Sequence, residues 1–146
     1  MGDTPEWKVI KTLIYGVRPS GGLAECGLRK TVGLCKSEYP LAHDPIMYDT
    51  YMDDCASGTA SATRSHHVMD EIECSLNKGG FTTKGMTESG KDPPAHLNKD
   101  GKSITVLGIK WFPKGDFSNS TLMRSTSARN CVGENAQVLL ESCHRS

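Results

Sequence analysis

The stretch Asp49-Thr50-Tyr51-Met52-Asp53-Asp54-Cys55-Ala56-Ser57-Gly58 decides how the rest of the chain is interpreted, because it places two carboxylates side by side between short apolar runs. Residues 45–48 before the pair and 55–57 after it are predicted to form strands. Successive side chains of an extended strand point to opposite faces. At the tip of a tight hairpin this alternation is broken, so we expect Asp53 and Asp54 to be exposed on the same side.

Two neighbouring carboxylates repel each other unless a cation holds both in the ionised form. Mg²⁺ prefers oxygen ligands and is often bound by one or two carboxylates together with substrate phosphates. Enzymes that transfer phosphoryl or nucleotidyl groups with two metal ions need such donors. The simpler alternative is that the pair only makes a turn, which aspartate favours through local hydrogen bonds. The flanking sequence is needed to distinguish a metal site from a simple turn.

The chain has 146 residues, which is enough for one domain with a modest core. Its net charge is zero, but the charges are distributed in blocks. Residues 38–73 are acidic, with eight Asp and Glu and a single Arg. The segments on either side are basic: residues 1–37 have six Lys and Arg and three acidic residues, and residues 74–114 have seven Lys and three acidic residues. An acidic centre between basic segments suits a metal site flanked by phosphate-binding surfaces, although a solvated surface would have the same pattern.

The six cysteines are scattered, include no C-x-x-C pair, and are not joined by histidines at zinc-ligand spacing. No apolar signal segment follows Met1, and no apolar run is long enough to span a membrane. We therefore expect reduced thiols in an intracellular protein that is not secreted and has no membrane partner.

Two helices are expected on either side of the aspartates. Apolar residues recur at helical spacing over residues 23–35, after a glycine-rich loop, and Ser20 is the candidate N-cap. The second helix is expected to start at Thr59 or Ser61 and to end at the glycines of residues 79–80. Its inner stripe is predicted to contain Ala62, Met69, Ile72 and Leu76.

Short apolar runs predict strands at residues 13–15 and 81–84, and residues 103–112 are expected to form one continuous strand. From residue 117 to residue 129 the chain is rich in Ser, Thr and Asn without a sustained period, and too few apolar residues follow to build a core, which predicts a disordered tail at residues 118–146.

Four segments, in this order, resemble motifs of the reverse transcriptases of the Pao (BEL/Pao) family of long-terminal-repeat retrotransposons. Residues 13–30 resemble the loop-and-helix motif that precedes the catalytic hairpin, and residues 49–58 resemble that hairpin. Residues 79–84 resemble the next palm motif, and residues 106–113 resemble the hairpin that grips the primer end. The resemblance covers about residues 7–117 and implies an α+β fold, in which residues 1–117 would be part of a polymerase palm, an antiparallel sheet backed by helices. The loss of resemblance after Phe117 implies that residues 118–146 are a tail unrelated to the palm.

The resemblance also implies a role for each matching residue. Asp53 and Asp54 would bind the Mg²⁺ ions of nucleotidyl transfer, with Mn²⁺ as a substitute, and Lys84 would lie near the nucleotide phosphates. Template and nucleotide would contact Ser20, Gly21, Gly22, Tyr51 and Met52. The primer strand would be supported by Gly108, Ile109, Lys110 and Trp111, of which Trp111 could equally be a core residue.

One further metal-binding aspartate of this family lies on an earlier strand, well upstream of the loop-and-helix motif. Only fifty residues precede Tyr51, and Asp3 stands in a polar opening without the apolar neighbours of that motif. We therefore expect part of an RNA-directed DNA polymerase that is inactive alone. The RNA or DNA template-primer and the dNTP would bind to the parent enzyme, which would also supply the fingers, thumb and ribonuclease H regions.

Two alternatives remain open. The chain could be a non-catalytic nucleic-acid-binding remnant that uses the lysines between Lys78 and Lys114, in which case its binding would depend on salt. It could also be a non-functional translated remnant, in which case the purified chain would be molten.

Overall fold

The structure is a computed structural model that describes residues 16–97, 101–119 and 144–145. These residues form three α-helices and small antiparallel sheets, so the expectation of an α+β fold is confirmed at the level of class. The elements in chain order are α1 (Ser20–Cys35), α2 (Pro40–Tyr48), β1 (Thr50–Tyr51), β2 (Asp54–Cys55), α3 (Ala62–Lys78), β3 (Phe81–Thr82), β4 (Ile104–Val106), β5 (Ile109–Phe112), a 3₁₀ turn η1 (Pro113–Gly115), β6 (Phe117–Asn119) and β7 (His144–Arg145).

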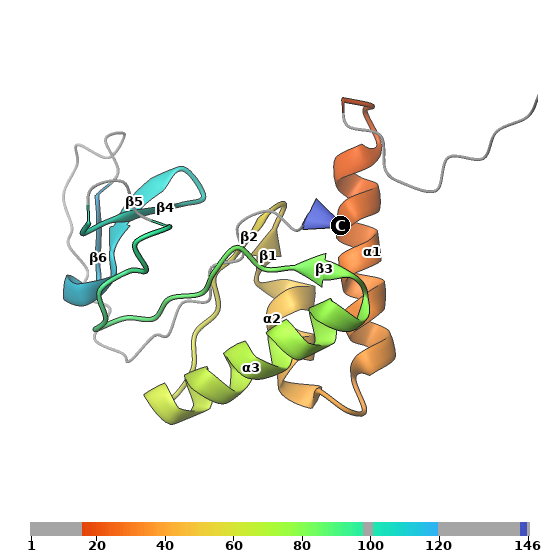
Figure 1. The fold of residues 1–146 in the computed structure, drawn as a ribbon, viewed down its shortest axis with the longest axis horizontal. Helices are drawn as coiled ribbons and strands as arrows, with labels where there is room; N and C mark the ends of the chain where they lie inside the picture. Colours follow the sequence, from red (N-terminus) through yellow and green to blue (C-terminus); the bar gives the residue numbers. More distant parts are fainter. Residues whose placement is uncertain (1–15, 98–100, 120–143, 146) are drawn as a thin grey trace, which may run out of the picture.

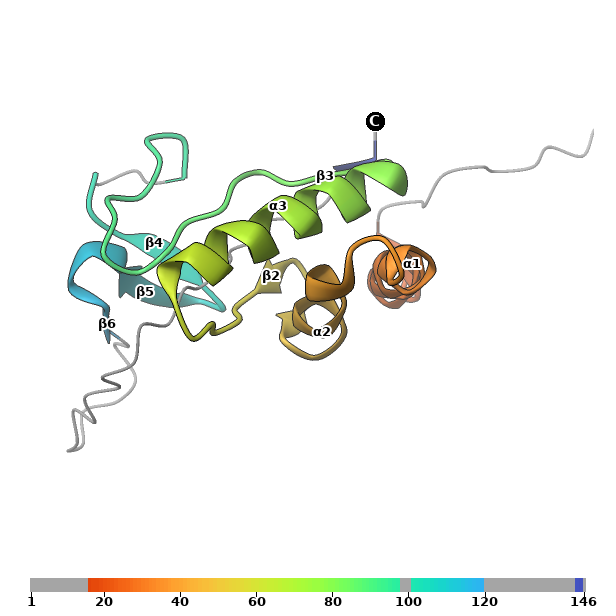
Figure 2. The same cartoon turned by 90° about the horizontal axis from the view of Figure 1, so that it is seen from below.

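The β1–β2 hairpin lies between two parts of the molecule, with α1 on one side and the sheet of β4, β5 and β6 on the other (Figure 1). Figure 2 shows the same order from a perpendicular direction, with α3 running across from the helical part toward that sheet. The aspartate pair is therefore placed where both parts can contribute residues to its surroundings.

Helix α1 begins at Ser20, close to where the helical periodicity predicted a helix. The predicted N-cap was wrong, because Pro19 occupies that position and Ser20 is the first helical residue, with no capping bond from a side chain at this end. Proline is suited to a helix start because its φ is already helical and its missing N–H has no partner there. Leu28 and Val32, four residues apart, form the buried stripe of the helix.

Residues 45–48 were predicted to be a strand, and this was wrong because they form the second half of helix α2. Pro40 stands at the first turn, where its missing N–H has no helical partner to lose. The backbone N–H of Leu41 donates to the Glu71 carboxylate on α3 at 2.6 Å, which places a negative charge at the helix N-terminus. Ala42 and Ile46 then face the core on one side of the helix. A four-residue apolar run cannot distinguish a strand from such a helix by its period alone.

Helix α3 begins at the predicted cap, where the Ser61 hydroxyl accepts a hydrogen bond from the Arg64 N–H at 3.3 Å. It ends before Gly79, also as predicted. The predicted inner stripe was partly wrong, because Ala62 is exposed and Met69 is only half-buried. The buried residues of the helix are Ser65, Val68, Ile72, Ser75 and Leu76.

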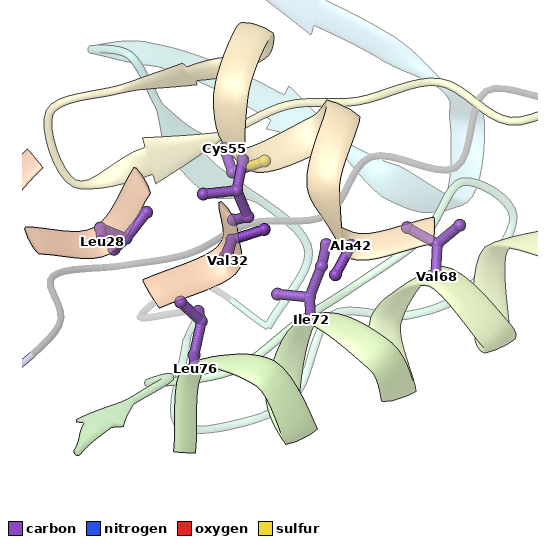
Figure 3. Close-up of a cluster of buried hydrophobic side chains, with 8 residues drawn as sticks. Leu28, Val32, Ala42, Cys55, Val68, Ile72 and Leu76 are labelled. Atoms are coloured by element: carbon purple, nitrogen blue, oxygen red, sulfur yellow. The ribbon is translucent and has the colours of Figure 1, made fainter. Parts of the chain in front are cut away.

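The three helices pack around one hydrophobic core, in which side chains from all three point toward one another (Figure 3). The β1–β2 hairpin contributes Cys55, which is fully buried in this cluster. The core residues are Leu28, Val32, Ala42, Ile46, Cys55, Val68, Ile72 and Leu76. Burial of this apolar surface is the main force that holds the hairpin against the helices.

Residues 103–112 were predicted to be one strand, and this was wrong because the chain reverses at Leu107 and Gly108. Strands β4 and β5 pair in antiparallel fashion, with Val106 opposite Ile109, and β6 pairs with the other edge of β5. Both turn residues have positive φ, 49° at Leu107 and 77° at Gly108, as two-residue hairpin turns of type I′ require. Glycine at the second turn position is the local signal for this reversal.

A second, smaller core lies in this sheet and contains the buried residues Ile104, Val106 and Trp111. The predicted strand at residues 81–84 is confirmed in part, because β3 covers its first two residues and pairs with β7. The strand predicted at residues 13–15 lies outside the described residues, as does most of the tail predicted at residues 118–146. The described residues of that tail complete β6 and form β7.

Candidate functional site

The hairpin that carries the aspartates is confirmed, with Thr50 opposite Cys55 and Tyr51 opposite Asp54. Met52 and Asp53 form its two-residue turn. Met52 has φ 51°, a left-handed conformation that methionine adopts rarely and that glycine usually supplies at the first position of a type II′ turn. Strain of this kind persists only where surrounding contacts impose it, and it is common at functional sites.

The base of the hairpin is anchored on the last turn of α2. The Pro45 carbonyl accepts hydrogen bonds from the Asp49 N–H at 2.9 Å and the Thr50 hydroxyl at 3.3 Å, and the Cys55 thiol approaches it at 3.6 Å. Burial raises the pKa of the Cys55 thiol to about 11, so Cys55 stays protonated and acts as a core residue. Helix α2, which was predicted to be a strand over residues 45–48, therefore determines where the hairpin tip points.

An open pocket of about 390 Å³ lies at the hairpin tip. The pocket is lined by residues of three segments that are far apart in the sequence. They are Tyr51, Met52, Asp53 and Asp54 from the hairpin, Lys84 from the segment after β3, and Leu107 and Gly108 from the β4–β5 turn. Six of these seven residues are ones for which the sequence predicted a role in a site.

The two carboxylates line the same pocket but differ in their surroundings. Asp53 is exposed at the turn, whereas Asp54 is half-buried, so the expectation that both are exposed was wrong for Asp54. The Oδ2 atom of Asp54 accepts a hydrogen bond from the backbone N–H of Leu107 at 2.7 Å. Leu107 is the lining residue that the sequence did not predict, because the single strand expected there would have no turn amide to offer.

These residues suit a divalent cation in part. Carboxylate oxygens are the ligands that Mg²⁺ prefers, and Lys84 adds a positive charge for an anionic group in the same pocket. Across the part of the chain that the structure describes, no group of three or more His, Cys, Asp or Glu is arranged to hold a metal ion. A cation at Asp53 and Asp54 would complete its ligand set with water, with a phosphate or with residues outside that part.

Several predicted site residues do not line this pocket. Trp111 is buried in the smaller core, and its indole N–H donates to the Asp116 carboxylate at 3.3 Å. Its strand neighbours Ile109 and Lys110 are exposed. The remaining three, Ser20, Gly21 and Gly22, form the first turn of α1.

A second charged cluster, which the sequence gave no reason to predict, connects α3 to the segment that follows β3. His66 is exposed, and its Nε2 atom lies 2.8 Å from Oε1 of the Glu88 carboxylate. Lys91 forms an ion pair with the same oxygen. Burial alone would raise the pKa of Glu88, but the hydrogen bonds with Lys91 and His66 outweigh it and hold that pKa below its ordinary value.

Comparison of the chain with known protein families, with curated proteins and with solved structures found no match. None of the helices in the described part of the chain is both long and apolar enough to cross a membrane. The four described cysteines, Cys26, Cys35, Cys55 and Cys74, are free thiols.

Proposed function

We propose that this chain carries the catalytic hairpin of an RNA-directed DNA polymerase palm of the retrotransposon type. The observation that supports the proposal is the composition of the pocket, because three of the four segments that carry the resemblance contribute to it. The hairpin supplies Asp53 and Asp54, the segment after β3 supplies Lys84, and the β4–β5 turn supplies Gly108. Three segments separated in sequence would not be expected to share one pocket if each resemblance were accidental.

In this proposal Asp53 and Asp54 hold Mg²⁺, which would neutralise phosphate charge and activate the primer hydroxyl in nucleotidyl transfer. Lys84 would bind phosphate oxygens as a point charge. Tyr51 and Met52, both largely exposed at the pocket, would offer apolar surface to a base or sugar. The turn interpretation of the aspartate pair gives no reason for a lysine and a second hairpin turn to share that pocket.

The resemblance implies a third carboxylate from an upstream strand, and the described residues arrange no third acidic ligand at the pocket. Positioning dominates phosphoryl-type transfer, and an error of about 1 Å can lower the rate on the order of 10²-fold. We therefore expect no polymerisation by this chain alone.

Primer extension on an RNA template with Mg²⁺ tests the proposal. The full chain is compared with the same chain fused to an upstream palm-and-fingers segment of a Pao-type polymerase. We expect extension only by the fusion, and its loss in Asp53→Asn. Asp49→Asn is the matched control, because Asp49 is an exposed carboxylate four residues away that does not line the pocket. Equal loss in both variants, or extension that survives Asp53→Asn, would contradict the proposed role of Asp53.

The non-catalytic nucleic-acid-binding alternative depends on free lysines between Lys78 and Lys114. Ion pairs with neighbouring carboxylates lower the charge that such a surface offers to phosphates, so this alternative has less support. Three of the lysines are paired in this way: Lys78 with Glu38, Lys91 with Glu88 and Lys114 with Asp92.

A further inference from the structure

The hydrogen bond between the Leu107 N–H and Asp54 joins two turns that are 53 residues apart in the sequence. Its length of 2.7 Å is typical of a hydrogen bond to an ionised carboxylate, which is about twice as strong as one between neutral groups. Asp54 lies at the start of β2 and Leu107 at the tip of the β4–β5 hairpin. The bond therefore attaches the sheet of β4, β5 and β6 to the aspartate pair.

The conformation of Leu107 shows that its amide is held in place. Its φ of 49° is unfavourable for a leucine, and at 49% exposure the side chain is not buried deeply enough to impose it. A left-handed residue of this kind persists where the surroundings over-determine its conformation. The type I′ turn and the hydrogen bond to Asp54 are two such constraints acting on the same amide.

A carboxylate has two oxygens, and the amide occupies only one of them. Oδ2 of Asp54 is bound to Leu107, which restricts rotation of the carboxylate and leaves Oδ1 for another partner in the pocket. Groups that hydrogen-bond to a ligating carboxylate orient it, and their loss typically weakens metal binding 10–100-fold.

We propose that the Leu107 backbone amide is a positioning group for Asp54, so that docking of the β4–β5 turn and cation binding at Asp53 and Asp54 strengthen each other. This inference rests on the proposed function, because it needs a cation at the aspartate pair. Coupling between two binding events is reciprocal. Cation binding therefore stabilises the docked β4–β5 turn by the same factor by which the docked turn raises the affinity for the cation.

The first test breaks the turn at its glycine. Gly108→Val introduces a side chain where φ is 77°, which valine does not tolerate, although no atom lies within 4 Å of the added Cβ. Gly90→Val is the matched control, because φ is 85° and the space is equally open, but Gly90 does not line the pocket. Mn²⁺ binding to the full chain is measured by water-proton relaxation. We expect binding about tenfold weaker in Gly108→Val and unchanged in Gly90→Val.

The second test leaves the β4–β5 turn unaltered and keeps the inference testable if Gly108→Val fails to fold. Exchange of the Leu107 amide hydrogen is measured with and without saturating Mg²⁺. A purely structural bond would exchange at the same rate in both conditions, whereas we expect Mg²⁺ to slow exchange about tenfold. Asp53→Asn, which leaves Asp54 and Leu107 in place, should abolish the slowing.

Two outcomes would overturn the inference while leaving the proposed function intact. One is that the Leu107 amide exchanges faster in Gly108→Val than in the wild type, while the variant binds Mn²⁺ with the wild-type affinity. The other is Leu107 exchange that does not respond to Mg²⁺ although Asp53→Asn weakens Mn²⁺ binding. Equal Mn²⁺ binding by the wild type and Asp53→Asn would overturn the proposed cation site, and with it the positioning role of Leu107.

Discussion

Leu107 occupies a left-handed position that asparagine would occupy at lower cost. Type I′ turns favour Asn-Gly because both residues need positive φ, and a left-handed conformation costs an ordinary L-residue about 1–2 kcal/mol. We predict that Leu107→Asn raises the free energy of unfolding by about 1 kcal/mol, because the leucine side chain is half exposed and its backbone N–H is retained. Urea denaturation measures the change. Ile109→Asn is the control, since Ile109 is similarly exposed but lies in β5, where asparagine is disfavoured, so stability should fall. A loss of stability in both variants would show that the leucine side chain matters more than its backbone conformation.

At the scale of elements, the end of α3 packs against α1 through Gly79. A Cβ added there would lie 2.5 Å from both Cγ2 and Oγ1 of Thr31, a short side chain whose hydroxyl is bonded to the Gly27 carbonyl at 2.9 Å. We predict that Gly79→Ala lowers the free energy of unfolding by about 1–3 kcal/mol through overpacking. Gly33→Ala, inside α1 with open space around it, should instead raise it by about 0.5–1 kcal/mol. In a Thr31→Ala background, Gly79→Ala should cost less, because the two nearest atoms are gone, although Cδ2 of Phe81 remains 3.0 Å from the added Cβ. Equal costs with and without Thr31 would contradict the contact.

The elements that the sequence predicted correctly are those with local signals. Helix α3 has the Ser61 cap, a helical period and a terminal Gly79, and the aspartate hairpin has a polar turn between short apolar runs. The error at residues 45–48 falls where an apolar run is too short for its period to distinguish a strand from a helix. At residues 103–112 the prediction overlooked the local turn signal of Gly108. In both places a tertiary contact supports the observed structure: the Glu71 carboxylate at the start of α2, and Asp54 at the tip of the β4–β5 turn.

At the scale of the whole molecule, the pairing of Asp54 with Leu107 and of Glu88 with His66 joins segments that no sequence pattern connects. The sequence therefore predicted the chemical types present at the pocket, including Asp53 and Lys84, but not these two contacts. Each contact joins residues more than twenty positions apart, which only the folded chain brings together.

Glu88 makes the stability of the whole molecule depend on pH, because it ties α3 to the segment after β3. Its pKa in the folded chain lies below the ordinary value of 4.5, so the ionised form is favoured by folding. The stabilisation is present above about pH 4.5 and is lost as the pH falls through the lower folded pKa. We predict that Glu88→Gln lowers the free energy of unfolding at pH 7 by about 1.5–3 kcal/mol, in the range for hydrogen bonds to charged groups. The difference from the wild type should shrink as the pH falls below 4.5. Denaturant unfolding of the variant and the wild type at pH 7 and at about pH 3 measures the stability difference at each pH. Glu73→Gln is the control, because Glu73 is an exposed residue of α3 and its substitution should change stability little. A difference that stays constant between the two pH values would show that Glu88 stabilises the fold by its packing and not by its charge.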